Sequence, residues 1–285
     1  MAEGGVPRFG AWEQAVRWLR EQPERQDLVR DAYYDDPLLA AAERYWASDE
    51  WCSVRALLPA SRQRALDVGA GRGIASYALA RDGFKRVAAL EPDPSAVVGA
   101  QAVRTLAAIS GLPIEVTQEF SERLPFDDAC FDLVFARAVL HHTRDLKAAC
   151  GEFFRVLKPG GRLIAVREHV ISRPEDLPTF LDLHPLHKLY GGENAFLLPQ
   201  YQAAIRGAGF ERLRTLAPFD SPINFAPRSA ASLRAEIAQR ASRRLPGAAL
   251  MLRAVLMPAW PLLRPLLNAV DGRPGRLYSF VADRP

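Results

Sequence analysis

The sequence has few cysteines, and they lack the spacings in which cysteines bind metals or form a disulfide framework. The 285 residues include only Cys52, Cys130 and Cys150, which favours a reducing compartment. The first residues do not contain a basic region followed by an apolar one, so we expect no signal peptide and a cytoplasmic location. Internal repeats and low-complexity segments are absent as well.

The basic residues are not interleaved with aromatic ones as in a recognisable nucleic-acid module, so we expect no nucleic-acid partner. Their distribution is nevertheless uneven. From Arg206 onward there are thirteen arginines, no lysine and five acids, a net charge of +8 within a chain of net charge +4. A solvated basic face would account for this excess, and so would attraction to an anionic acceptor or an anionic membrane surface.

One stretch, Arg64 to Ile74, has a pattern strong enough to predict a fold. It begins as a short apolar strand, continues through Gly69, Gly71 and Gly73, and leads into a helical pattern. A strand, a tight glycine turn and a helix form the opening unit of a doubly wound α/β domain. A dinucleotide fingerprint needs a further glycine where Ile74 stands, so an NAD-dependent oxidoreductase is the weaker interpretation.

Two acids accompany this turn. Asp67 lies inside the strand just before the first glycine, and Glu91 ends the next strand, eighteen residues after Gly73. A carboxylate at Asp67 can receive an ammonium group or brace the amides of the turn, and one at Glu91 can bind two ribose hydroxyls. A ligand with a ribose and an amino-acid tail, but without phosphate, is S-adenosylmethionine.

The stretch resembles motif I of the class I S-adenosylmethionine-dependent methyltransferases. Leu124-Pro125-Phe126, Phe131-Asp132-Leu133-Val134, Leu140-His141-His142 and Arg155 to Gly161 are similar to segments of the small-molecule branch called type 11. The resemblance covers Arg64 to Phe210, roughly half of the chain. It implies S-adenosylmethionine as cofactor and a Rossmann-like, doubly wound α/β sheet of seven strands, the last of them antiparallel.

The length suits one α/β domain with substantial additions. We expect an N-terminal helical cap at 1–60, a methyltransferase core at 61–217, a helical lid insertion at 218–275 and the last core strand at 276–285. The apolar stretch 248–270 contains arginines and prolines, which argue against a transmembrane span. It is interpreted as a packed lid, a homodimer contact or a peripheral membrane contact. Periodicity predicts strands at 64–68, 86–91, 114–117, 131–135, 162–167 and 211–217, and helices at 73–81, 94–107, 145–156 and 199–208.

The resemblance assigns the cofactor site residue by residue. Gly69, Ala70 and Gly71 would contact the methionine part, with Asp67 bracing it, and Glu91 would bind the ribose. Phe120 and Ser121 would lie by the adenine, although the family often has an acid at the position of Phe120. Arg137, at the exit of the fourth strand, could meet the cofactor carboxylate.

All five histidines fall between the end of the fourth strand and the segment after the fifth, the side toward which a methyl group should point. His142 and His169 are the candidate catalytic bases for an alcohol acceptor, and His142 could instead only orient its loop. The candidate substrate-binding residues are His141, Arg167, His184, His187, Tyr190 and Glu193. A lone His-x-x-His pair is a weak metal signal, so we expect no metal.

The sequence thus predicts an enzyme that moves a methyl group from S-adenosylmethionine to a small molecule. A hydroxyl oxygen of a glycan or glycolipid precursor, or of a secondary metabolite, is the expected acceptor. The alternatives are a nitrogen or carbon methyltransferase and a non-catalytic protein that binds S-adenosylmethionine.

Overall fold

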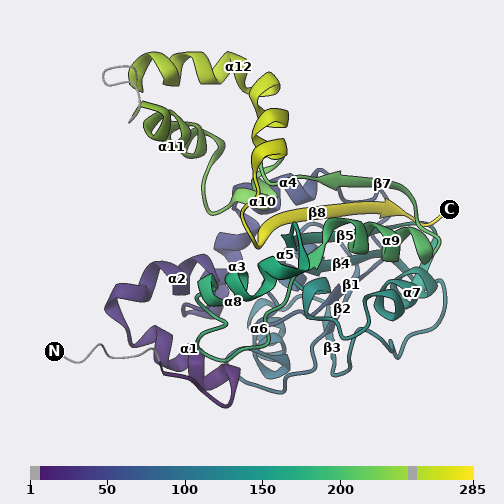
Figure 1. Ribbon diagram of the computed structural model, residues 1–285. Helices are drawn as coiled ribbons and strands as arrows, with labels where there is room; N and C mark the ends of the chain where they lie inside the picture. Colours follow the sequence, from purple (N-terminus) through teal and green to yellow (C-terminus); the bar gives the residue numbers. More distant parts are fainter. Residues whose placement is uncertain (1–6, 243–248) are drawn as a thin grey trace.

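The computed structural model describes residues 7–242 and 249–285. Its centre is one mixed β-sheet with helices on both faces (Figure 1). The strand order is β3-β2-β1-β4-β5-β8-β7, and a short β6 pairs with β5 outside this order. β1 to β5 pair in parallel, whereas β8 runs antiparallel to β5 and β7. The strands are β1 (Arg64–Val68), β2 (Arg86–Leu90), β3 (Ile114–Thr117), β4 (Phe131–Arg137), β5 (Leu157–Ile171), β6 (Phe196–Leu197), β7 (Glu211–Leu216) and β8 (Arg276–Asp283).

The predicted fold class, with its antiparallel last strand, is confirmed. β6 is an addition to the predicted seven strands, and β5 is longer than the predicted 162–167. Side chains of the central strands alternate between two apolar layers, with Leu66 and Val134 in one layer and Leu133 and Ile164 in the other. Because β1 pairs with β2 on one side and β4 on the other, a crevice opens beyond the carboxyl ends of these strands.

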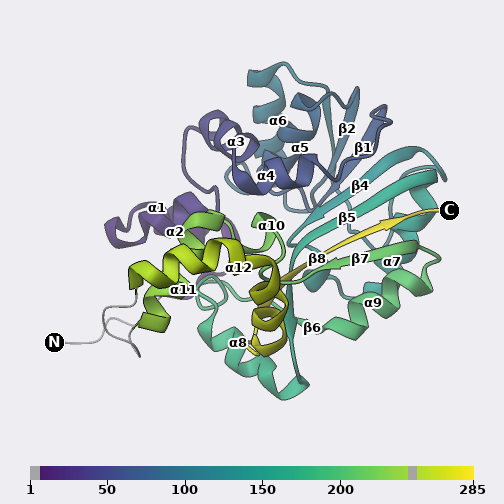
Figure 2. The same cartoon turned by 90° about the horizontal axis from the view of Figure 1, so that it is seen from above.

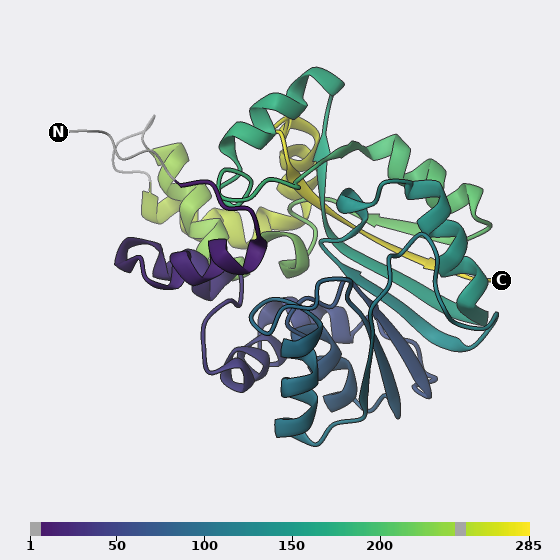
Figure 3. The same cartoon turned by 90° about the horizontal axis from the view of Figure 1, so that it is seen from below.

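The crossover helices cover the two faces of the sheet. They are α5 (Ile74–Arg81), α6 (Ala100–Ser110), α7 (Leu146–Val156) and α9 (Leu198–Gly207). Figure 3 shows α5 and α6 on one side of the strands and α7 and α9 on the other. The predicted start of α6 at Pro94 is wrong, because the side chains of Asp93 and Ser95 accept hydrogen bonds from the amides of Ser95 and Val97. Such local bonds compete with helical ones, and the helix begins only after Gly99.

The N-terminal segment, where the sequence predicts a helical cap, is mainly helical between Trp12 and Arg55. It contains α1 (Trp12–Arg20), a 3₁₀ turn (Pro23–Arg25), α2 (Gln26–Asp31), α3 (Leu38–Trp46) and α4 (Asp49–Arg55). Pro37 is the residue before α3 rather than its first helical residue. The buried Arg72 of the glycine turn donates hydrogen bonds to the carbonyl oxygens of Tyr33 and Asp35 and pairs with Asp36. These contacts tie the connection between α2 and α3 to the turn.

Two insertions follow β5. The first contains a 3₁₀ turn (Pro174–Asp176) and α8 (Leu177–Leu183), and the second contains α10 (Pro222–Phe225), α11 (Ala230–Ser242) and α12 (Ala249–Val270). Helices α11 and α12 pair with each other and project from the sheet (Figures 1 and 2). No helix in the described part of the chain has the length and apolarity that crossing a bilayer requires.

The predicted roles of 248–270 lie partly outside the described residues, because residue 248 is not among them. In the described part of α12, Leu262, Leu266 and Val270 are exposed. A lid, a homodimer contact or a peripheral membrane contact stays a prediction, as do the bounds of the four predicted segments.

Candidate active site

The glycine turn connects β1 to α5 and faces Glu91 at the end of β2. Gly69, Gly71 and Gly73 all have positive φ, between 54° and 82°, which is the region that favours residues without a Cβ atom. The amide of Gly71 donates to Oε2 of Glu91 at 2.6 Å, and the amide of Asp93 donates to Oε1 at 2.9 Å. The Glu91 carboxylate is therefore held at the turn, as the sequence predicts for a ribose-binding acid.

One cavity, here called the Glu91 cavity, opens at this point and has a volume of about 480 Å³. The predicted residues Gly69, Gly71, Glu91, Phe120 and Ser121 line it. Phe120 is 53% exposed, so its ring is available to stack with a flat ligand, and the Arg144 guanidinium lies 5.3 Å from its ring centre. The structure thus brings the predicted ribose and adenine residues together.

Asp67 and Glu91 are both buried carboxyl groups. Burial raises the pKa of Asp67 to about 7, against the hydrogen bond that the Ser76 hydroxyl donates at 2.6 Å. Burial likewise raises the pKa of Glu91 to about 7, although the amides of Asp93 and Gly71 oppose this rise. A ligand that donates hydrogen bonds or carries an ammonium group would favour the ionised form of each.

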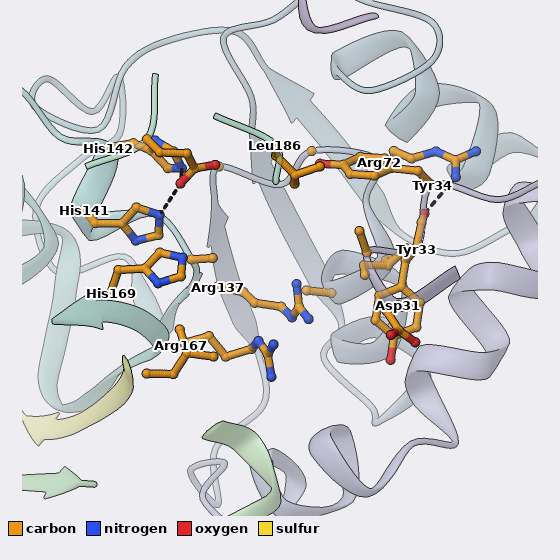
Figure 4. Close-up of a pocket in the computed structure, with 18 of the residues that line it drawn as sticks. Asp31, Tyr33, Tyr34, Arg72, Arg137, His141, His142, Arg167, His169 and Leu186 are labelled. Atoms are coloured by element: carbon orange, nitrogen blue, oxygen red, sulfur yellow. Dashed lines mark hydrogen bonds and ion pairs between the residues drawn. The ribbon is translucent and has the colours of Figure 1, made fainter. Parts of the chain in front are cut away.

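A second cavity of about 380 Å³, here called the histidine cavity, lies beside the first. Gly69, Gly71, Tyr34, His142 and Glu193 line both cavities, so the two adjoin. Figure 4 shows His141, His142 and His169 together on one side, with Arg137 and Arg167 nearby and Asp31 and Tyr33 opposite them. The predicted residues that line this cavity are Asp67, Gly69, Ala70, Gly71, Arg137, His141, His142, Arg167, His169, His184 and Glu193.

His141 lies between two carboxylates. Its Nδ1 is 2.7 Å from Oε2 of Glu168, and its Nε2 is 3.5 Å from Oε2 of Glu193. Burial lowers the pKa of His141, but the bonds to Glu168 and Glu193 outweigh this effect and raise it to about 9. Burial and the neighbouring His141 lower the pKa of His169 to about 3, so His169 is neutral.

Hydrogen bonds to backbone carbonyl groups fix the tautomers of His142 and His169. Nδ1 of His169 is 2.8 Å from the carbonyl oxygen of Gly275, and Nδ1 of His142 is 2.9 Å from that of Gly192. A carbonyl oxygen only accepts, so Nδ1 carries the proton in both rings and Nε2 of each neutral ring keeps a lone pair. Burial and the charge of His141 lower the pKa of His142 below 6.5.

A bulge in β5 positions three consecutive side chains of the site, those of Arg167, Glu168 and His169. The pairing of β5 with β8 shifts between Ala165 and Glu168, and Arg167 has a φ of 62°. Bulges re-aim side chains beside active sites. Here Arg167 and His169 line the histidine cavity, and Glu168 contacts His141.

Arg137 and Arg167 share one buried carboxylate, Glu50 of α4. Arg137 donates two hydrogen bonds to Glu50, at 2.6 and 3.1 Å, and Arg167 lies 3.6 Å from it. Burial raises the pKa of Glu50, but the two arginines outweigh this effect and hold it below its usual range. The two arginines carry one positive charge more than Glu50 neutralises, and this excess suits a ligand with a carboxylate group. Contact of Arg137 with the cofactor carboxylate stays a prediction.

The predicted substrate-binding residues of the segment 184–193 lie at different places. Nδ1 of His184 lies 3.8 Å from Glu193 at the histidine cavity, and Tyr190 packs on Trp12 and lines the Glu91 cavity. The structure does not bring His187 into this group. Its side chain lines neither cavity, and only its amide contacts His184, at 3.3 Å. A direct substrate contact of His187 is therefore not supported by its position.

The site residues predicted from the sequence do not include Asp31, Tyr33, Tyr34, Arg72 or Glu50. The first four line the histidine cavity, and the fifth pairs with its arginines. Tyr33 and Tyr34 belong to an N-terminal segment dense in aromatic residues, and an aromatic face near the sulfonium could gain some cation–π attraction. Nothing in the sequence marks Glu50, because its partners are more than eighty residues away.

Comparison with known proteins locates the similarity in the same part of the chain. The type 11 family described as a methyltransferase domain matches residues 66–165. The O-methyltransferase resE of Aspergillus sclerotiorum is 28% identical over 223 residues, which are 75% of this chain and 81% of that protein. The demethylmenaquinone methyltransferase of Clavibacter sepedonicus is 37% identical over 112 residues, which are 39% of this chain and 44% of that protein.

A solved structure shows the same fold. Geranyl diphosphate methyltransferase in complex with S-adenosylmethionine aligns with a TM-score of 0.57 at 16% identity, over 89% of this chain and 94% of that one. At this identity the likeness concerns the fold alone. The chain spans most of resE but less than half of the demethylmenaquinone methyltransferase.

Proposed function

Because this chain is a class I methyltransferase that uses S-adenosylmethionine, we propose that it methylates a hydroxyl oxygen of a small molecule. One observation supports an acceptor that must lose a proton, and the similarity to the O-methyltransferase resE favours oxygen over carbon. His142 lines both cavities, and its Nδ1–H is held by the Gly192 carbonyl, which leaves the Nε2 lone pair for a proton. An alcohol must lose a proton when it is methylated, and a neutral imidazole is suited to take it.

In methyl transfer the main task of the protein is to position the acceptor and the methyl group for reaction. The acceptor oxygen attacks the methyl carbon in line, the bond between that carbon and sulfur breaks, and the electron pair goes to sulfur. The leaving thioether is neutral and good, so alignment of the two reactants supplies much of the acceleration. With adenosine in the Glu91 cavity and the methionine part at Asp67 and Gly69, the acceptor would occupy the remainder of the histidine cavity, beside His142 and His169.

The lining of the histidine cavity supports a polar acceptor. Arg167 and Asp31 are charged, and Tyr33 adds a hydroxyl group. A glycan or glycolipid precursor or a hydroxylated secondary metabolite fits this chemistry. The similarity to resE, which is an O-methyltransferase, points the same way. His169 is the second candidate base by position, since its Nε2 is also available, but a pKa of about 3 makes it a weak base.

Carbon methylation is the second candidate. It is favoured by the 37% identity to a demethylmenaquinone methyltransferase, over 39% of this chain. A carbon acceptor also loses a proton, so the same histidines could serve it. A nitrogen acceptor and a non-catalytic protein that binds S-adenosylmethionine have no observation of their own in their favour. The cytoplasmic location stays a prediction.

The test is an acceptor screen. Purified protein is incubated with S-adenosylmethionine and with hydroxylated sugars, glycolipid precursors, phenols and polyketides, and S-adenosylhomocysteine release is measured. NMR of each product then assigns the new methyl group to oxygen, nitrogen or carbon. An acceptor-dependent O-methyl product is expected. A product methylated at carbon would contradict the proposal, as would cofactor binding without release for every acceptor. Glu91→Ala serves as the cofactor-binding control.

A further inference from the structure

We propose that the histidine cavity binds one divalent transition-metal ion through His141, His169 and Glu193. A ligand atom of each of these residues lies within 4.8 Å of the others. The three come from separate parts of the fold: the turn after β4, the strand β5 and the loop before β6. In the sequence, His184, His187 and Glu193 are of residue types that bind metals, but a His-x-x-His pair alone is a weak signal, and it does not include His141 or His169.

The outer contacts of the two histidines are those of metal ligands. A ligating histidine usually donates its other ring N–H to a carboxylate or a backbone carbonyl, which orients the ring. His141 does this to the Glu168 carboxylate at 2.7 Å, and His169 does it to the Gly275 carbonyl at 2.8 Å. The remaining nitrogen of His141, Nε2, is the atom that faces Glu193.

The charge of the cluster leads to the same inference. Glu168 is fully buried, and the side chain of Glu193 is 13% exposed. Across residues 7–242 and 249–285, the ion-pair partners of these two carboxylates are histidines, without an arginine or lysine. The charged His141 lies between the two carboxylates and balances one of their two negative charges, whereas a divalent ion that replaces its proton would balance both.

The donor set restricts the kind of ion. Two imidazoles and one carboxylate with open positions suit zinc, iron, cobalt or manganese, whereas magnesium prefers oxygen ligands and water. His184 stands 3.8 Å from Glu193 and could complete the coordination sphere. A metal here would face the space where the acceptor is proposed to lie.

The role of the ion in catalysis, unlike its binding, rests on the proposed function. A metal in this cavity would bind the acceptor oxygen and lower the pKa of its hydroxyl group. His142 would take the released proton, and the oxygen would then attack the methyl carbon as described above. His169 would in that case be a ligand rather than a base.

Metal binding is tested without cofactor or acceptor. Protein is freed of metal by a chelator and dialysis, and Co²⁺ and Zn²⁺ are added in separate calorimetric titrations. The visible absorption of Co²⁺ reports its ligands. We expect one ion per chain and a Co²⁺ spectrum with nitrogen ligands. Glu193→Gln and His169→Gln should weaken binding more than about 100-fold, and Glu168→Gln about 10- to 100-fold, as for outer contacts in general.

The matched control is His187→Gln, which also removes a histidine but lies outside both cavities. It should bind the ion as the unmodified protein does, and circular dichroism checks that every variant is folded. The proposal is overturned if the unmodified protein binds no tighter than His169→Gln, or if His187→Gln loses as much affinity as Glu193→Gln. Since no acceptor is present, failure of methyl transfer would not affect this result, and absence of metal would not exclude methyl transfer.

Discussion

Glu168 holds His141 at two points, because its carboxylate accepts the backbone N–H at 3.1 Å and the ring Nδ1–H at 2.7 Å. The same carboxylate accepts the amide of Val139 at 3.1 Å. One buried side chain of β5 therefore fixes both the turn after β4 and the direction of the imidazole in the cavity. No local sequence pattern connects these residues, which are 27 positions apart.

Replacing Glu168 should cost stability. Glu168→Ala leaves the amides of Val139 and His141 and the ring nitrogen without their acceptor in a buried place, so we expect a loss of about 3–5 kcal/mol in the free energy of unfolding. Glu168→Gln retains an acceptor oxygen and should lose about 1–2 kcal/mol. Urea denaturation measures both. Glu175→Ala, at an exposed residue, is the control, and an equally stable Glu168→Ala would refute the role of this carboxylate.

The glycine turn should not tolerate a methyl group at Gly69. Its φ is +61°, and an added Cβ would lie 2.7 Å from Cγ2 of Val139. We expect Gly69→Ala to lose about 2–3 kcal/mol of stability, of which the left-handed backbone accounts for about 1–2 kcal/mol. Gly151→Ala is the matched control, because it lies inside α7 with nothing within 4 Å. There alanine should stabilise the helix by up to about 1 kcal/mol, so equal melting temperatures for the two variants would contradict this account.

Cofactor binding should weaken as the pH falls. Glu91 has a pKa of about 7 in the free protein, and ribose hydroxyls donate hydrogen bonds best to its ionised form. Above pH 7 the Glu91 carboxyl group is mostly ionised before the cofactor binds, whereas below pH 7 it must first lose its proton. We therefore expect the Kd of S-adenosylmethionine to be about tenfold higher at pH 6 than at pH 8 for each carboxyl that must ionise.

Calorimetry across this pH range, with two variants, identifies the group. Glu91→Gln should bind weakly at every pH and with less pH dependence, the remainder coming from Asp67, whose pKa is also about 7. Glu115→Gln, an exposed acid on β3, should behave as the unmodified protein does. An unchanged pH dependence in Glu91→Gln would remove Glu91 from the explanation.

The sequence was sufficient for the sheet and for the grouping of the residues that are predicted to bind the cofactor, because both depend on local patterns. A buried strand such as Arg64–Val68, a glycine turn and an acid at a strand end all occur within a few tens of residues. Gly69, Gly71 and Glu91 are accordingly together in the structure. The helix start at Ala100 was missed because the side chains of Asp93 and Ser95 form a turn that apolar periodicity does not reveal.

The histidine side of the site could be predicted only as a cluster. Sequence position indicated that the histidines gather at one edge, and four of the five line the same cavity. It could not indicate which ring nitrogen is free, because that depends on the carbonyl groups of Gly192 and Gly275. Nor could it pair Glu50 with Arg137, since the partner is supplied by tertiary packing alone.

Removing Glu50 should destabilise the fold strongly. Its side chain is 1% exposed and pairs with Arg137 and Arg167. Glu50→Ala leaves two buried guanidinium groups without their anion, so we expect a loss of about 3–5 kcal/mol. Thermal and urea unfolding measure this, with the exposed Glu43→Ala as the control. If Glu50→Ala is as stable as Glu43→Ala, the arginines must obtain compensation from another group.

His142 should set both the rate and its pH dependence. Substitution by glutamine removes the base but keeps a polar side chain, so we expect kcat to fall about 10²- to 10⁴-fold with little change in the KM for S-adenosylmethionine. His187→Gln, outside the cavities, should retain full activity. Burial and the charge of His141 lower the pKa of His142. The neutral base therefore persists to lower pH, and the loss of activity on acidification should have its midpoint below pH 6.5.

That midpoint discriminates between a base and an orienting residue. If His142 only positions the loop through its bond to Gly192, asparagine or glutamine could replace that bond. In that case kcat would fall little, and the decrease of kcat at low pH, here called the acid limb, would remain in the variant. If His142 takes the proton, the acid limb should disappear in His142→Gln, because the group whose protonation stops the reaction is gone. Measuring kcat from pH 5 to pH 9 for both proteins with one acceptor therefore separates the two roles by the shape of the profile as well as by the rate.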